Sequence, residues 1–308
     1  MKKAFVFWVE EYFYNPTPVQ KIVSFLLLPL SWLYCLGVYL RFRSKTPTDF
    51  GIDIVSIGNL SVGGSGKTPL VTALASRYEE AAIILRGYGR QSSGLVVVKD
   101  KTEVLCDVHV SGDEAMIYAQ KLPKAIVIVS EDRKIAIQKA KEMGAQLIFL
   151  DDAYSKHEIK KLDFLIEVTS KNSACLPAGP FRERVWNSKK CTILQDGIDF
   201  KRVVTLKDKC DKMSLVTAIA RPKRLDKYLP AVLHKHYFED HHIFSKSELE
   251  EILNRDKAES LLVTYKDFVK MQTFGLALSL LDLEIQVDAK VFESIELYRK
   301  NSLKDAVH

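Results

Sequence analysis

The sequence predicts an α/β protein with a parallel-sheet domain, a second, smaller α/β domain and an N-terminal membrane-associated helix. Short apolar runs alternate with helix-like stretches, and the segments after these runs are polar or rich in glycine. A single long apolar run lies near the N-terminus. The chain has 308 residues, of which 47% are hydrophobic, and this is enough for about two domains with a sizeable core.

The composition argues against several classes of protein. Its hydrophobic fraction is too high for a disordered chain, and 14 glycines with 10 prolines exclude a collagen-like or low-complexity chain. A polytopic membrane protein would need more than one long apolar stretch. The five cysteines are scattered, without a Cys-x-x-Cys pair, which argues against a disulfide scaffold or zinc site and favours a reducing compartment. The net charge of +6 is a mild bias toward anionic partners.

The apolar run near the N-terminus covers residues 22–40 and is flanked by cations on both sides. A bilayer core of about 30 Å needs about 20 apolar helical residues, so the run is just long enough to span. Trp32 and Tyr39 are rings of the kind that settle at headgroup depth. We expect residues 1–47 to attach to a membrane, either across it or within one leaflet; a buried helix of a soluble domain is the alternative. The cations after the run predict that the rest of the chain faces the cytoplasm.

Five short apolar runs are predicted strands, because they are continuous rather than alternating, as in strands covered on both faces. They lie at 52–57, 82–85, 125–129, 146–150 and 164–168, with helix-like stretches at 69–78, 113–121 and 133–143. Such an alternation implies right-handed units of a parallel sheet, whose ligands bind at the carboxyl ends of the strands. We therefore expect the working face at the segments just after these strands.

The pattern changes after about residue 195. Charged, linker-like sequence at 201–212 leads to apolar runs at 214–220, 260–264 and 285–287. We predict that residues 48–200 form the parallel-sheet domain and that residues 201–308 form the smaller α/β domain.

The loop after the first predicted strand is typical of a P-loop, which binds the phosphates of a nucleotide. It comprises Gly63, Gly64, Ser65, Gly66, Lys67 and Thr68. Glycine lets backbone N–H groups close around phosphate oxygens, and the adjoining helix adds the positive end of its dipole. Lys67 would reach the β- and γ-phosphates and the Thr68 hydroxyl would bind Mg²⁺. Ser61 stands where the general pattern has its first glycine. The larger domain is therefore predicted to be P-loop NTPase-like.

Two further segments suit phosphate chemistry but also have ordinary interpretations. Asp151 and Asp152 come after a predicted strand, where P-loop proteins hold Mg²⁺, although a solvated turn would also carry acids there. Arg86 and Arg90 flank a Gly-Tyr-Gly turn, which suits an anion, although a surface turn has the same composition.

Other polar segments are ambiguous when taken alone. Asp113 and Glu114 open a predicted helix, where simple capping explains an acid. The segment 131–133 has the same ambiguity. His241 and His242 are adjacent and share no helix face, which argues against a zinc pair; a histidine beside the cleft could instead orient an acid.

Taken together, these elements resemble one family of enzymes. They occur in one order: 56–69 (SIGNLSVGGSGKTP), 86–90, 112–114, 131–133, 151–152, 176–183 (LPAGPFRE) and 240–242. This order is similar to that of the tetraacyldisaccharide 4'-kinases, the lipid A 4'-kinases of Gram-negative envelope synthesis. The resemblance extends from the membrane segment to about Lys270.

The resemblance implies a kinase that uses ATP and Mg²⁺. Its acceptor would be the 4'-hydroxyl of a lipid A precursor, tetraacyldisaccharide 1-phosphate, and its product lipid IV-A. It would work at a membrane surface, on the cytoplasmic face of the bacterial inner membrane, without nucleic acid as a partner; the oligomeric state stays open.

The resemblance also assigns roles to residues. Asp113 would take the hydroxyl proton, His241 would orient or tune Asp113, and Lys67 would serve the phosphates. The metal would be held by Thr68, Asp151, Asp152 and Glu183. A positive electrostatic field at the predicted working face, which attracts anionic substrates, would come from Arg86, Arg90, Arg133 and Arg182.

The chain departs from the family in two places, and no role is assigned to the residues that differ. The family element close to DDGFQHR is DDAYSKH at 151–157, and a TEKD-like element is TYKD at 264–267. The alternative function is a membrane-associated ATPase or GTPase. Lys266 stands one place too late for a guanine-specific element, which argues against GTP. A scaffold with a decayed nucleotide site is a further alternative, against which the intact Lys67 and Thr68 argue.

Overall fold

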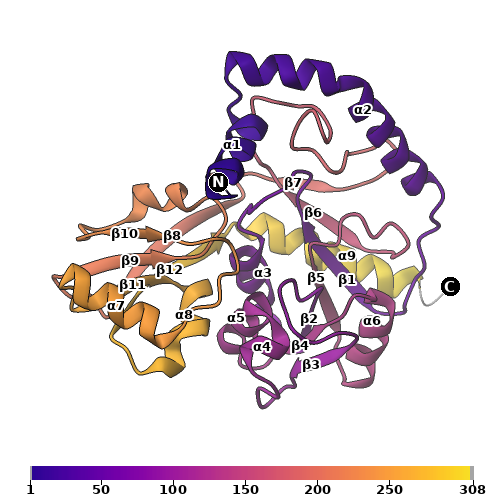
Figure 1. The fold of residues 1–308 in the computed structure, drawn as a ribbon. Helices are drawn as coiled ribbons and strands as arrows, with labels where there is room; N and C mark the ends of the chain where they lie inside the picture. Colours follow the sequence, from indigo (N-terminus) through magenta and orange to yellow (C-terminus); the bar gives the residue numbers. More distant parts are fainter. Residues whose placement is uncertain (1, 306–308) are drawn as a thin grey trace. The chain divides into compact units, whose positions relative to one another are not determined.

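The structure is a computed structural model that describes residues 2–305 (Figure 1). The chain groups into two compact units: Met1–Lys67 with Leu150–Asp196 and Glu293–His308, and Thr68–Phe149 with Gly197–Phe292. The predicted boundaries at residues 47 and 200 correspond to a different division. The predicted boundaries therefore stay a prediction. Residues 1 and 306–308, which belong to the predicted first and last domains, lie outside the described part of the chain.

The first sheet has seven strands in the order β3-β4-β2-β5-β1-β6-β7. They are β1 (Asp53–Gly58), β2 (Ala81–Leu85), β3 (Val96–Lys99), β4 (Ile126–Val129), β5 (Leu147–Asp151), β6 (Leu162–Ile166) and β7 (Thr192–Leu194). The pairs β1–β6, β6–β7 and β2–β4 are parallel, whereas β3 pairs antiparallel with β4. The five predicted strands are confirmed as a buried parallel set. Strands β3 and β7 were not predicted, because they are short edge strands with partly exposed residues.

The helices that alternate with these strands are α3 (Lys67–Ala75), α4 (Val108–Ser111), α5 (Asp113–Lys121) and α6 (Arg133–Glu142). Asp132 caps α6 by accepting a hydrogen bond from the Lys134 amide at 2.8 Å. The predicted helices at 69–78, 113–121 and 133–143 are thus confirmed. A last helix, α9 (Ala289–Asp305), was not predicted.

The second sheet has the order β10-β9-β11-β12-β8. Its strands are β8 (Phe200–Lys207), β9 (Met213–Thr217), β10 (Lys235–Tyr237), β11 (Ser260–Thr264) and β12 (Leu278–Val287). The helices α7 (Lys246–Asp256) and α8 (Tyr265–Met271) and the 3-10 turns η1 (Pro222–Tyr228) and η2 (Gln272–Phe274) complete this part. Leu249, Leu261 and Met271 pack in its core.

One prediction about this region is wrong. The charged stretch expected to be a linker contains β8, which pairs antiparallel with β12 along eight residues. An edge strand exposes part of its side chains to water, so charged residues are tolerated there and hide the strand from a hydrophobicity pattern.

Two helices open the chain, α1 (Lys2–Tyr14) and α2 (Pro18–Arg43). By length and composition, α2 is the one helix among the described residues that could cross a membrane, and its most apolar window is only 11% buried. Phe25 and Trp32 are each 70% exposed. The Thr17 hydroxyl accepts a hydrogen bond from the Gln20 amide at 3.3 Å, which marks a capped start of α2. The predicted apolar helix is therefore present, and longer than expected.

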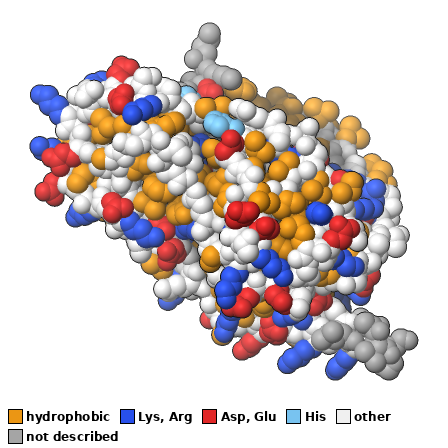
Figure 2. All heavy atoms as spheres, turned by 90° about the horizontal axis from the view of Figure 1, so that it is seen from below, with side chains coloured by type: hydrophobic (Ala, Val, Ile, Leu, Met, Phe, Trp, Pro, Cys, Tyr) orange, Lys and Arg blue, Asp and Glu red, His pale blue; other side chains and the backbone are white. Residues whose placement is uncertain are grey.

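The charged side chains in the view of Figure 2 are mixed in sign. Lys and Arg alternate there with Asp and Glu, and hydrophobic side chains lie between them. The net charge of +6 is therefore not gathered into a single-sign patch on this face.

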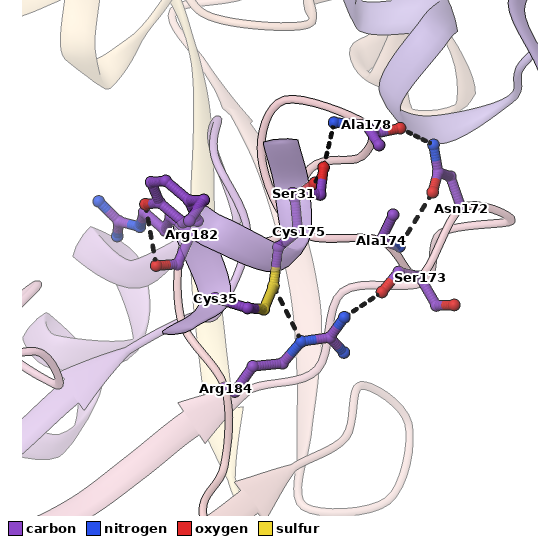
Figure 3. The surroundings of a disulfide bond; sticks show 10 residues. Ser31, Cys35, Asn172, Ser173, Ala174, Cys175, Ala178, Arg182 and Arg184 are labelled. Atoms are coloured by element: carbon purple, nitrogen blue, oxygen red, sulfur yellow. Dashed lines mark hydrogen bonds between the residues drawn. A yellow bond between two sulfur atoms is a disulfide. The ribbon is translucent and has the colours of Figure 1, made fainter. Parts of the chain in front are cut away.

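Cys35 of α2 and Cys175 form a disulfide, a pairing that the scattered cysteines did not predict (Figure 3). The bridge joins α2 to the 172–184 loop, where the Ser31 hydroxyl also donates to the Cys175 carbonyl at 2.9 Å. Residues 140 apart in sequence have no spacing signal that would reveal such a pair. This disulfide therefore does not support the reducing compartment that the scattered cysteines favoured.

Candidate active site

The predicted P-loop lies between β1 and α3 and has the backbone of a phosphate-binding turn. Gly63 and Gly66 adopt φ angles of 89° and 80°, which glycine adopts without strain. Lys67 is the first residue of α3, and its Nζ donates to Asn59 Oδ1 at 3.0 Å. The loop thus combines flexible glycines, a helix N-terminus and one ammonium group, which are the features that bind phosphate.

The predicted 176–183 element holds the approach to this loop in place. The Val62 amide donates to the Pro180 carbonyl at 2.9 Å, and the Arg182 amide donates to the Leu60 carbonyl at 2.8 Å. Ser61 forms a bridge with Phe181 and has no positive φ angle. A side chain is therefore accommodated where the general pattern has glycine, because the tight turn begins only at Gly63.

The paired acids lie at the carboxyl end of β5, as predicted. Asp151 is buried at the end of the strand, and Asp152 adopts a φ angle of 52° while its amide donates to the Ile57 carbonyl at 2.9 Å. The Asp152 carboxylate is ion-paired with Arg182 and lies 3.6 Å from Lys67 Nζ. Burial raises the pKa of Asp152, but these two cations outweigh it, so this pKa lies below its usual value. Asp152 is therefore an anion beside the loop.

The other two predicted metal ligands are Glu183 and Thr68. The buried Glu183 carboxylate is ion-paired with Arg41 and lies 3.8 Å from His157 Nε2, while Thr68 lies in the first turn of α3. Within residues 2–305, no group of three or more His, Cys, Asp or Glu side chains could hold a metal. Mg²⁺ is usually bound by one or two carboxylates together with substrate phosphates. The oxygen donors of Asp151 and Asp152 therefore fit Mg²⁺. Glu183 pairs with Arg41 of α2, and its role as a metal ligand stays a prediction.

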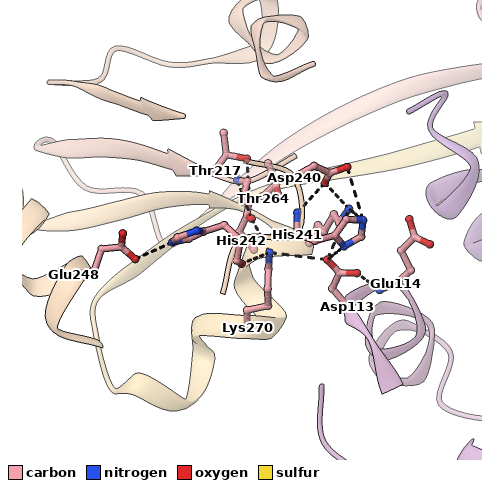
Figure 4. Close-up of polar contacts among 12 residues, drawn as sticks. Asp113, Glu114, Thr217, Asp240, His241, His242, Glu248, Thr264 and Lys270 are labelled. Atoms are coloured by element: carbon pink, nitrogen blue, oxygen red, sulfur yellow. Dashed lines mark hydrogen bonds and ion pairs between the residues drawn. The ribbon is translucent and has the colours of Figure 1, made fainter. Parts of the chain in front are cut away.

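The predicted catalytic pair is in contact (Figure 4). His241 Nδ1 lies 3.1 Å from Asp113 Oδ2, although the two residues are 128 positions apart. Because an ionised carboxylate only accepts, the imidazole donates through Nδ1–H. Asp113 opens α5 after Gly112, whose φ of 81° suits glycine. Gly89 leaves room for His241, since a Cβ there would lie 3.2 Å from His241 Nδ1.

Two lysines of α8 surround this pair. Lys266 Nζ lies 3.4 Å from His241 Nε2 and 3.7 Å from Asp113 Oδ2, and Lys270 Nζ lies 3.9 Å from the same carboxylate oxygen. Lys266 also donates to Asp240 Oδ1 at 3.0 Å. The carboxylate therefore has an imidazole and two ammonium groups within 4 Å.

These contacts move the pKa values of the pair in opposite directions. Burial raises the pKa of Asp113, but the hydrogen bond from His241 and the charge of Lys266 outweigh it, and the pKa lies below its usual value. The hydrogen bond to Asp113 raises the pKa of His241 above its usual value. Asp113 is therefore a carboxylate near neutral pH, which is the form that accepts a proton.

The four predicted substrate cations have different surroundings. Arg86 is exposed. Arg90 pairs with Glu131 at 2.5 Å, Arg133 donates to the Ser130 carbonyl, and Arg182 pairs with Asp152. A contribution of these four side chains to substrate binding stays a prediction.

A cavity of about 480 Å³ opens beside the catalytic pair. Asp113 and His241 line it together with Met116, Phe244 and Lys270. Its volume lies within the range of roughly 300–1,000 Å³ that is typical of ligand pockets. A small polar group can therefore approach Asp113 from this cavity.

Three residues of these sites were not predicted: Asn59, Lys266 and Lys270. Asn59 lies in the recognised string at 56–69, but its amide bonds with Lys67 and with the Ser61 carbonyl are visible only in the fold. The TYKD element was noted without a role, because its contact with Asp113 depends on long-range packing.

Comparisons with known proteins agree on one family. Residues 23–209 and 198–299 match the family model described as Tetraacyldisaccharide-1-P 4'-kinase. The chain is 48% identical over 311 residues to the tetraacyldisaccharide 4'-kinase of Aliarcobacter butzleri, covering 97% of this chain and 98% of that protein. The corresponding protein of Helicobacter pylori is 41% identical over 295 residues, with 94% of each chain covered.

A solved structure has a similar fold. The crystal structure of the "apo" form of LpxK from Aquifex aeolicus, in complex with ATP, matches with a TM-score of 0.68. It is 22% identical, and the match covers 91% of this chain and 99% of that one.

Proposed function

Because the chain belongs to the tetraacyldisaccharide-1-P 4'-kinase family, we propose a role in this kinase reaction for each of its site residues. The enzyme is a phosphotransferase that uses ATP with Mg²⁺. It transfers the γ-phosphoryl group to the 4'-hydroxyl of tetraacyldisaccharide 1-phosphate, and the product is lipid IV-A of lipid A biosynthesis. A membrane-associated ATPase or GTPase is the less favoured alternative.

Asp113 serves as the general base. Its Oδ2 accepts the proton of the 4'-hydroxyl while the hydroxyl oxygen bonds to the γ-phosphorus and the bond to the bridging oxygen breaks, which releases ADP. The low pKa of Asp113 keeps it ionised for this step, and His241 holds the carboxylate in position through Nδ1–H. Phosphoryl transfer depends mostly on positioning and charge neutralisation, so a single well-placed base suffices.

Lys67 and the amides of residues 63–68 hold the nucleotide phosphates. Asn59 fixes the Lys67 ammonium group before ATP binds. Asp151, Asp152 and the Thr68 hydroxyl would hold Mg²⁺, which neutralises charge on the phosphates. Arg182 carries a further positive charge at the Asp152 carboxylate. Arg86, Arg90 and Arg133 are proposed to contribute to the field that attracts anionic substrates.

We also propose that the enzyme works on the cytoplasmic face of the bacterial inner membrane. The exposed apolar surface of α2 supports attachment, since an acceptor with four acyl chains stays in the bilayer. Arg41 and Arg43 at the end of α2 favour the cytoplasmic side for the chain beyond this helix.

The contact between Asp113 and His241 is the observation that carries the proposed mechanism. The test is transfer of label from radiolabelled ATP to tetraacyldisaccharide 1-phosphate in detergent, with the label scored at the 4' oxygen. Asp113→Asn should lower kcat by roughly 10²–10⁴-fold, because it removes the base. The control Asp226→Asn removes an exposed carboxylate and should keep wild-type activity.

Two results would contradict this proposal. Equal activity of Asp113→Asn and wild type would exclude Asp113 as the base. Rapid ATP turnover without the lipid acceptor would favour a hydrolase, because a lipid kinase should need its acceptor.

A further inference from the structure

A second cavity, of about 380 Å³, lies at the carboxyl end of α2. Six cationic side chains line it, with Asp163 as the lining carboxylate: Arg43, Lys45, Lys160, Lys161, Lys189 and Lys190. The lining contains none of the P-loop residues, nor Asp152 or Arg182, so this cavity is separate from the proposed nucleotide site.

The inner part of the cavity is a built cationic cluster. Asp163 is buried and lies 3.3 Å from Lys161 Nζ and 3.2 Å from Lys189 Nζ. The side chains of Lys161 and Lys189 are only 1% and 10% exposed. Lys189 also donates to the Tyr154 carbonyl at 2.9 Å, which fixes its position. One carboxylate thus faces two buried ammonium groups, and a positive charge is left over.

The outer part carries cations that the protein does not neutralise. Arg43, Lys45 and Lys190 are exposed and form no salt bridge with any residue from 2 to 305. Lys160 pairs with Asp49 at 3.0 Å. The cavity is therefore an electropositive recess whose rim is open to an anion.

The position of the cavity relates it to the proposed membrane surface. Leu36 and Leu40, which precede it on α2, are 52% and 56% exposed. Tyr39 packs against Trp186 with ring centroids 5.1 Å apart, and Phe42 of the cavity wall lies 6.3 Å from the same ring. Tyrosine and tryptophan favour the depth of lipid headgroups. If the apolar surface of α2 enters the bilayer, the recess lies at headgroup level.

We propose that this recess binds the phosphate headgroup of an anionic phospholipid whose acyl chains lie along the apolar surface of α2. The inference rests on the proposed membrane attachment. Basic pockets beside membrane helices on the cytoplasmic side are suited to such headgroups. The volume fits a headgroup, and the unneutralised rim favours a bilayer that carries negative charge over a neutral one.

The test is flotation of the full-length protein with vesicles of phosphatidylcholine alone or with 30% phosphatidylglycerol, in ~150 mM salt. The variant combines Arg43→Gln, Lys45→Gln and Lys190→Gln. The matched control removes the same charge from exposed sites outside the recess by Lys134→Gln, Lys201→Gln and Lys209→Gln. Wild type should prefer the anionic vesicles. The recess variant lacks three cations and, at about fivefold per cation, should bind them roughly 100-fold more weakly, and the control only a few-fold more weakly.

Several outcomes would overturn the proposal. Equal losses for variant and control would indicate diffuse charge rather than a site. Equal binding of wild type to both vesicles would remove the headgroup preference while leaving membrane attachment intact, whereas binding to neither would refute attachment itself. Competition by inorganic phosphate at millimolar concentration would assign the recess to a free anion. If the recess variant had a raised KM for the lipid acceptor in neutral micelles, the recess would instead bind the phosphate of the acceptor.

Discussion

Lys266 shows how one side chain can act on a reaction through its neighbours. It contacts the imidazole of His241 and the carboxylates of Asp113 and Asp240 at 3.4, 3.7 and 3.0 Å. Burial lowers the pKa of Lys266, but these carboxylates raise it to about 12, so the ammonium group is charged at all working pH values. We infer that Lys266 is a positioning residue that keeps Asp113 ionised.

Replacing Lys266 should change the pH dependence of the kinase. The Lys266 charge lowers the pKa of Asp113, so Lys266→Met should raise this pKa and move the acidic limb of the kcat/KM profile to higher pH. We expect kcat at neutral pH to fall by less than the roughly 10²–10⁴-fold that loss of the base itself costs, because Asp113 is still present. The KM for ATP should stay unchanged. Lys266→Arg keeps the charge and should restore most of the profile, whereas an unshifted acidic limb in Lys266→Met would contradict this role.

At the scale of the elements, α8 is attached to the second sheet through Asp267. This side chain is fully buried and accepts hydrogen bonds from the Thr217 and Thr264 hydroxyls, each at 2.7 Å, and from the Ala218 amide at 3.0 Å (Figure 4 shows Thr217 and Thr264). These three hydrogen bonds to Asp267, together called the Asp267 clasp, hold the start of α8 against the ends of β9 and β11. Since α8 carries Lys266, the clasp also places a cation at the catalytic pair.

Breaking this clasp should destabilise the second sheet and its helices. Asp267→Ala leaves buried donors without their acceptor, and such a loss in a buried charged network costs about 3–5 kcal/mol. Urea unfolding followed by circular dichroism should show the midpoint of the affected transition falling accordingly. Asp211→Ala, at an exposed position, should leave the midpoint unchanged. A loss below ~1 kcal/mol in Asp267→Ala would show that the clasp is not structural.

At the scale of the whole molecule, attachment to a bilayer depends on a surface rather than on a site. Exposed apolar side chains occur singly on most proteins, but α2 concentrates them, with Leu26 and Leu33 70% and 67% exposed. The contacts of Ser24 and Ser31 with the 172–184 loop show that α2 is also packed onto the chain along one side. This helix therefore has one face packed on the protein and one exposed apolar face, which we propose contacts lipid.

Making the lipid-facing side polar should release the protein from membranes. Leu26→Gln with Leu33→Gln removes apolar surface worth about 1.5–3 kcal/mol per side chain, so the partition coefficient measured by vesicle sedimentation should fall by at least roughly 100-fold. The affinity for ATP should not change. Ile135→Gln with Ile198→Gln alters exposed residues elsewhere and should have little effect. Unchanged sedimentation of the α2 variant would argue against attachment through this surface.

Features built from contiguous residues follow from the amino-acid sequence alone. The P-loop, the buried strands and the apolar helix each depend on a short run of residues, whose periodicity and composition reflect local physical chemistry. Asp151 and Asp152 could be placed at the end of a strand for the same reason. The order of the motifs along the chain was enough to indicate the family.

Contacts between residues far apart in the chain depend on the three-dimensional packing. Asp113, His241 and Lys266 come from three segments, and Arg90 and Arg133 prove to be engaged by Glu131 and the Ser130 carbonyl. The Cys35–Cys175 bridge and strand β8 depend in the same way on partners far along the chain. Such pairings are set by the packing of the sheets and their connections, and a single sequence holds no local record of that packing.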